Sequence, residues 1–64
     1  MITGIVIALP QELETLTTRK IAKGSTIALS KNLLLAYSGA GAENAQTAAN
    51  LLIAQGAARL ISWG

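Results

Sequence analysis

The sequence predicts an α/β domain with a largely parallel sheet and the element order β-α-β-β-α-β. Two observations support this prediction. Apolar runs recur along the chain, the first of them rich in β-branched residues, and segments with apolar side chains at helical spacing lie between them. Alternating strands and helices are typical of α/β folds, in which helices connect neighbouring parallel strands.

The first strand and the first helix are expected over residues 2–8 and 10–19. Residues 2–8 are apolar on both alternations, a pattern typical of a strand buried on both faces. Pro10 suits the first turn of a helix, and Leu13 and Leu16 follow at helical spacing. Three threonines between positions 15 and 18 are poor helix formers, so they leave the end of this helix open.

Gly24 interrupts the chain, and the apolar runs at 25–29 and 32–37 are separated by a short polar turn. This pattern predicts a β-hairpin. An Ala-rich helix is expected over residues 42–55, with Gly56 as its C-terminal cap. Its packed side is expected to carry Ala45, Ala48, Ala49, Leu52 and Ile53. Residues 59–63 predict a last, buried strand.

Composition excludes several classes of function. The chain has 64 residues and no Cys or His, so it lacks disulfides, thiolate catalysis and the commonest metal ligand, and we expect no metal and no cofactor. Aromatic residues are only 3%, and the five basic residues are spread out, which argues against a nucleic-acid partner. No apolar run reaches roughly 18 residues and no signal-peptide pattern is present, so we expect no membrane partner and a cytoplasmic location.

The size of the chain fits poorly with a self-sufficient domain. The sequence is rich in Ala, Leu and Ile, with almost no large aromatic residues and no covalent staple. Ligands of open α/β sheets bind beyond the carboxyl ends of the strands, and the last predicted strand reaches Gly64. We therefore expect residues 1–64 to be one part of a larger domain.

A glycine-rich junction lies between the hairpin and the Ala-rich helix, at Ser38, Gly39, Ala40 and Gly41. Glycines let the backbone turn tightly and approach a ligand, and a helix N-terminus presents free N–H groups to an anion or to hydroxyls. A dinucleotide fingerprint would need a third glycine where Asn44 stands, with a later acidic residue. Two interpretations stay open, a ligand-binding loop and a tight connection whose glycines only allow packing.

Glu12 is the second candidate, because it follows the first predicted strand directly. A carboxylate there can accept a proton from water or hold a sugar hydroxyl, or it can simply complement the helix dipole. Ser38 has no histidine to activate it, so a hydrogen-bonding role in the turn is favoured over that of a nucleophile. Trp63, near the end of the last strand, either lines a pocket or belongs to the core.

Three segments in order resemble the nucleoside phosphorylase/nucleosidase superfamily. The opening I-T-G-I-V-I-A-L-P-Q-E-L is similar to the start of the 5′-methylthioadenosine/S-adenosylhomocysteine nucleosidases, which begin with a G-I-I-G-A-M-x-x-E type segment. The later S-G-A-G-A-E-N-A and L-I-S-W-G are similar to the family's S-G-I-G-x-x-x-A and I-x-x-G-x-A-G segments. The order and spacing agree over essentially the whole chain, and the match is closest to the hopanoid-associated phosphorylase branch.

The resemblance implies a three-layer α/β/α fold and a homo-oligomeric enzyme that cleaves the N-glycosidic bond of a purine nucleoside. Glu12 matches the family's glutamate that helps to position the nucleophilic water. Gly64 matches the glycine before the family's nucleophile-binding serine. The segment that lines the ribose or anion side of the pocket corresponds to Ser38, Gly39, Ala40 and Gly41. The carboxylate that protonates the purine would lie downstream, so we expect this chain to be inactive alone.

Departures from the family bear on the nucleophile. Phosphorylase members carry arginines that grip phosphate after the first strand and at the later one. Here those places read A-L-P-Q-E, ending at Glu12, and S-W-G, so hydrolysis is favoured over phosphorolysis. The alternative function is a small nucleotide-binding or structural α/β module that uses the loop at residues 39–41 or associates through its exposed sheet.

Overall fold

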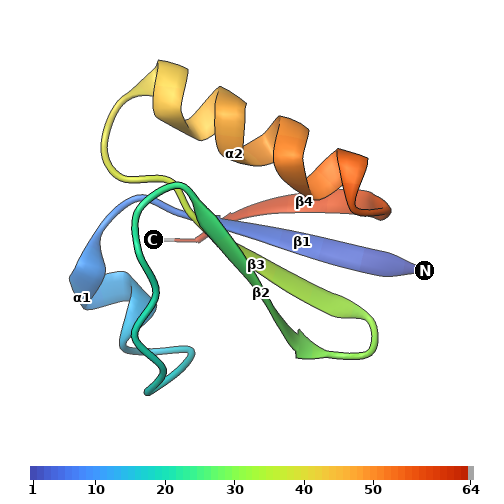
Figure 1. The fold of residues 1–64 in the computed structure, drawn as a ribbon, viewed down its shortest axis with the longest axis horizontal. Helices are drawn as coiled ribbons and strands as arrows, with labels where there is room; N and C mark the ends of the chain where they lie inside the picture. Colours follow the sequence, from blue (N-terminus) through green and yellow to red (C-terminus); the bar gives the residue numbers. More distant parts are fainter. Residues whose placement is uncertain (64) are drawn as a thin grey trace.

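The computed structural model describes residues 1–63, which form a mixed α/β fold with four strands and two helices (Figure 1). The element order β-α-β-β-α-β confirms the order predicted from the sequence. The elements are β1 (Ile2–Ile7), α1 (Pro10–Leu13), β2 (Ser25–Ser30), β3 (Leu33–Tyr37), α2 (Ala42–Ala54) and β4 (Ala57–Trp63). Among the described residues, no helix combines the length and the apolar character needed to cross a membrane.

The sheet has the strand order β2-β3-β1-β4 and is mixed. β1 pairs in parallel with both β3 and β4, whereas β2 and β3 form the predicted antiparallel hairpin. The carboxyl ends of β1, β3 and β4 therefore meet at one edge, where α1 begins and the loop into α2 lies (Figure 1). This edge carries most of the residues singled out from the sequence.

Each face of the sheet has its own core. On the face that carries α1, the side chains of Ile5 and Ile7 pack with Leu13, Leu35 and Tyr37. On the opposite face, α2 packs through two buried side chains onto the middle of the sheet. That second cluster consists of Ala36, Ala48 and Leu52, flanked by Val6, Leu34 and Ala57. The two clusters follow from the alternation of side chains along a strand, because the apolar run of β1 places apolar side chains on both faces of the sheet.

A glycine in β1 brings α2 close to the sheet. Gly4 is buried, and a Cβ atom at this position would lie 3.0 Å from Leu52 Cδ1 and 3.2 Å from Ala57 Cβ. Both distances are shorter than ordinary carbon–carbon contacts. The absence of a side chain at Gly4 thus sets the spacing between α2 and β1.

The first helix is much shorter than predicted. The sequence predicts residues 10–19, but α1 ends at Leu13 and the chain continues without a helix or strand to β2. The hydroxyl of Thr15 donates to the carbonyl of Glu12 at 2.6 Å, and the Thr17 hydroxyl accepts the backbone N–H of Arg19 at 3.1 Å. Threonine side chains compete in this way for backbone groups that a helix would use.

The predicted burial of the last strand is also wrong. β4 begins at Ala57, two residues earlier than expected, and all of its residues from Ala58 onward are exposed. The reason is topological, because β4 lies at the edge of the sheet and pairs with β1 alone. Its apolar composition therefore reflects an exposed edge strand and not a core strand.

The second helix matches its prediction closely, ending at Ala54 in place of residue 55. Gly56 follows with φ +103° and donates its N–H to the Ile53 carbonyl at 3.0 Å, as expected of a C-terminal glycine. Ala48 and Leu52 are buried as predicted, but Ile53 is 55% exposed. Ile53 lies beyond the narrow stripe by which α2 contacts the sheet.

Candidate functional site

A hollow of about 710 Å³ lies at the carboxyl edge of the sheet, between α1 and the end of β4. The pairing of Ile7 with Trp63 places the end of β4 beside the end of β1, from which the chain passes into α1. The hollow is lined by Gln11, Glu12, Thr15, Ile61, Ser62 and Trp63. Its position agrees with the general location of ligand sites in open α/β sheets.

Glu12 occupies this wall through the first turn after β1. Its backbone N–H donates to the carbonyl of Leu9 at 3.2 Å, and its Oε1 accepts the backbone N–H of Leu9 at 3.3 Å. This reciprocal pair closes the start of α1 and holds the carboxylate near the sheet edge. The side chain is partly exposed, and Oε2 makes no hydrogen bond to residues 1–63. Glu12 therefore closes the turn through Oε1 and is also one of the residues that line the hollow.

Trp63 forms the aromatic part of the wall. Its side chain is 41% exposed, so of the two interpretations left open by the sequence the structure favours the pocket wall. Its Nε1–H donates to Thr15 Oγ1 at 3.0 Å, and this hydroxyl in turn donates to the Glu12 carbonyl at 2.6 Å. Two hydrogen bonds thus link the indole to the turn that carries Glu12.

Thr15 is a residue of this site that the sequence prediction missed. As a threonine in an expected helix, it is recognisable from the sequence only as a poor helix former. Nothing in the local sequence relates it to Trp63, 48 positions away. The one available signal was the run of threonines where a helix was expected, since such hydroxyls commonly bond to nearby backbone or to distant side chains.

Ser38 lies at the end of β3, inside the protein. It is 6% exposed, and its Oγ is 2.8 Å from the Gly39 carbonyl oxygen and 3.2 Å from that of Ile7. Its backbone N–H also donates to the Ile7 carbonyl at 2.8 Å. The hydroxyl has one proton, and both acceptors within reach belong to the protein itself. Ser38 therefore ties the loop after β3 to the end of β1.

The rest of the glycine-rich loop turns toward α2. Gly39 is buried with φ +79°, and Gly41 has φ +105° directly before the helix. Ala40 and Gly41 are exposed, and Asn44 donates its side-chain N–H to the Ala40 carbonyl at 2.9 Å. The structure places this loop on the same sheet edge as Glu12, but none of residues 38–41 lines the hollow beside Glu12. Gly64, the remaining residue predicted for the site, lies outside the described residues.

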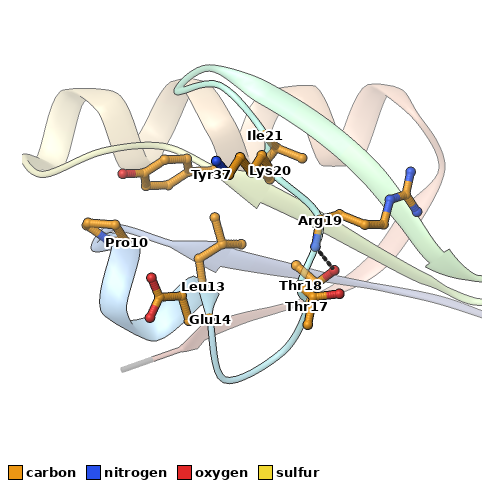
Figure 2. A pocket seen from close by; sticks show the side chains of 9 residues that line it. All are labelled: Pro10, Leu13, Glu14, Thr17, Thr18, Arg19, Lys20, Ile21 and Tyr37. Atoms are coloured by element: carbon orange, nitrogen blue, oxygen red, sulfur yellow. Dashed lines mark hydrogen bonds between the residues drawn. The ribbon is translucent and has the colours of Figure 1, made fainter.

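A second hollow, of about 520 Å³, lies on the other side of α1, against the segment that follows it (Figure 2). Tyr37 and Lys20 face Pro10 and Leu13 across it, whereas the guanidinium of Arg19 points away from the other side chains (Figure 2). That guanidinium donates to the Ala28 carbonyl at 3.4 Å. The two hollows have different walls. The second contains Glu14 and Tyr37, the last residue of β3, together with the cationic Arg19 and Lys20, whereas the one beside Glu12 contains the end of β4.

Within residues 1–63, no three acidic, histidine or cysteine side chains gather as ligands of a metal ion would. Comparison of the chain with protein-family models, with curated proteins and with solved structures found no match.

Proposed function

We propose that this chain supplies the water-positioning part of an enzyme that hydrolyses the N-glycosidic bond of a purine nucleoside. The observation that carries the proposal is the position of Glu12, which lines a hollow of about 710 Å³ at the carboxyl edge of the parallel strands. The volume lies within the range of about 300–1,000 Å³ typical of small-molecule sites. The sequence resemblance described above adds the reaction class, the three-layer fold and a homo-oligomeric enzyme to this proposal.

The proposed reaction uses Glu12 as the general base. The carboxylate accepts a proton from a water molecule while the water oxygen forms a bond to C1′ of the sugar. The bond from C1′ to the purine nitrogen breaks, and the purine leaves with a proton from an acid. Glu12 is the one acidic residue in this wall among the residues that the structure describes, so that acid must come from elsewhere. We accordingly expect these 64 residues alone to release no purine.

Water is preferred to phosphate because of the charge of the wall. No lysine or arginine lines the hollow beside Glu12 in the described part of the chain. A phosphate nucleophile would meet a carboxylate there without the charge-assisted hydrogen bonds by which cationic side chains hold phosphate. A neutral water molecule meets no such repulsion and can donate to the carboxylate.

The test is adenine release from 5′-methylthioadenosine by the native protein that carries this sequence. We expect release that does not require phosphate and that falls roughly 100-fold or more in Glu12→Gln, the usual contribution of a general base. Glu14→Gln is the matched control, since Glu14 is an exposed neighbouring carboxylate outside this hollow. A strict requirement for phosphate, or equal rates in Glu12→Gln and the parent, would overturn the proposal.

The alternative is a small nucleotide-binding or structural module that uses the loop at residues 39–41. It is favoured by one feature, the exposed Gly41 with φ +105° before the 13-residue helix α2. In that case Gly41→Ala would weaken nucleotide binding while Glu12→Gln would leave it unchanged. The nucleosidase proposal predicts the reverse order of sensitivity for nucleoside hydrolysis.

A further inference from the structure

We propose that Trp63 is the side chain on which the purine ring of the ligand stacks, and that Thr15 is a positioning residue that fixes the indole for this contact. The inference rests on the proposed function, which it deepens by assigning the part of the hollow that recognises the base. Glu12 and Trp63 line the same hollow, so a nucleoside with its base on the indole would have its sugar toward the carboxylate.

The first argument is the exposure of Trp63. Trp63 is 41% exposed on the edge strand β4, so a large part of the indole is accessible to a ligand. It is a wall of the hollow together with Ile61, which is 46% exposed. Two apolar side chains of one wall thus remain open to solvent, where a planar ligand could cover them.

The second argument is the fixed orientation of the ring. Trp63 Nε1 donates to Thr15 Oγ1 at 3.0 Å, and Thr15 Oγ1 donates to the Glu12 carbonyl at 2.6 Å. The indole nitrogen is therefore satisfied within the protein, which leaves the apolar ring as the surface offered to a ligand. A ring already held in place loses little side-chain entropy when a ligand stacks on it.

The chemical class of the ligand follows from the remaining wall. Among the residues that the structure describes, Glu12 is the only charged one lining the hollow, and Gln11 and Ser62 are neutral polar groups. This wall disfavours anions and suits a neutral, flat heterocycle with N–H donors. Adenine has this chemistry, with a π-face for the indole and an exocyclic amine for an oxygen acceptor.

The chain itself provides the reporter, because Trp63 is its only tryptophan. Titration with free adenine should quench the tryptophan fluorescence in a saturable way, whereas ribose should leave it unchanged. Thr15→Val removes the hydroxyl at constant volume and should weaken adenine binding several-fold, and Thr15→Ser should restore it. Thr18→Val is the matched control, since Thr18 lies in the same segment but outside this hollow.

Equilibrium dialysis with adenine tests Trp63 directly. Trp63→Ala should weaken binding about 5- to 150-fold, the range for loss of one base–aromatic stack, and Trp63→Phe should retain most of the affinity. Circular dichroism checks that each variant is folded. If Trp63→Ala does not fold, the adenine affinities of the Thr15 variants decide whether the indole binds the purine. Equal adenine affinity in Thr15→Val and Thr15→Ser would overturn the positioning role, and absence of saturable quenching in the parent would overturn the stacking site.

Failure of this inference and failure of the proposed function give different results. If adenine quenches the fluorescence of Trp63 as expected but Glu12→Gln leaves hydrolysis intact, the stacking site is supported and the assignment of Glu12 as the general base is wrong. If hydrolysis depends on Glu12 but adenine does not affect Trp63, the reaction stands and the purine binds elsewhere.

Discussion

Replacement of Gly4 by alanine tests how closely α2 lies against the sheet. The new Cβ would lie 3.0 Å from Leu52 Cδ1, 3.1 Å from Leu52 Cβ and 3.2 Å from Ala57 Cβ. The first of these atoms is the end of a flexible side chain, but Leu52 is fully buried and packs in the core cluster with Ala36 and Ala48. The other two are Cβ atoms, which move only with the backbone. The substitution must therefore shift α2 or β4 away from β1.

Overpacking of this kind costs about 1–3 kcal/mol. The lower conformational entropy of alanine in the unfolded chain offsets about 0.4–1 kcal/mol of this cost. We therefore expect Gly4→Ala to lower the free energy of unfolding by about 1–2 kcal/mol. Urea unfolding followed by circular dichroism measures this difference. In a thermal scan, each 1 kcal/mol corresponds to a fall of about 4–8 °C in Tm for a domain of this size.

Gly24 provides the control, because a Cβ there would meet nothing within 4 Å while its φ is +84°. Asparagine tolerates that backbone conformation better than alanine. Gly24→Asn should therefore cost less than Gly24→Ala, whereas Gly4→Asn should cost more than Gly4→Ala. Wild-type stability in Gly4→Ala, or the same order of costs at both glycines, would refute the reasoning from close packing.

Two further predictions concern the end of β3 and the edge of the sheet. Ser38→Ala should lower the free energy of unfolding by about 1 kcal/mol, because it removes the buried hydroxyl that reaches the Gly39 and Ile7 carbonyls. Urea unfolding measures this difference, and unchanged stability would show that the hydroxyl makes no stabilising hydrogen bond. Because β4 is an exposed apolar edge strand, we expect the chain to self-associate, and Leu60→Lys should reduce this association by placing a charge on the strand. Sedimentation velocity that shows a monomeric unsubstituted chain at high concentration would contradict the prediction.

The boundaries of the hairpin and of α2 could be predicted because local signals determine them. Gly24 and the polar turn at residues 31–32 bound the hairpin strands, and Gly56 follows the helix in a conformation that favours glycine. The end of α1 could not be placed in this way. Its threonines have low helix propensity, but which backbone group each hydroxyl bonds depends on the path of the chain beyond it.

For the candidate site, the sequence indicates the edge of the sheet but not which side chains each residue contacts. Glu12 is a candidate because it lies in the turn just past the first strand, and the structure places it in the wall of a hollow. Ser38 is a candidate because it belongs to the glycine-rich junction after a strand, yet its hydroxyl bonds to carbonyl groups inside the protein. Both residues follow parallel strands, so their different exposure could come only from the packing around each strand end.

The sequence by itself determined the α/β class, the order of the elements and the apolar character of each strand, because hydrophobic periodicity and glycine positions act over a few neighbouring residues. The tertiary structure alone decided that β4 is an exposed edge strand and that Trp63 bonds to Thr15 beside Glu12. These features depend on strand order and register, which bring together residues 48 positions apart. Local patterns contain no information about such contacts, since the same apolar run can pair at the centre or at the edge of a sheet.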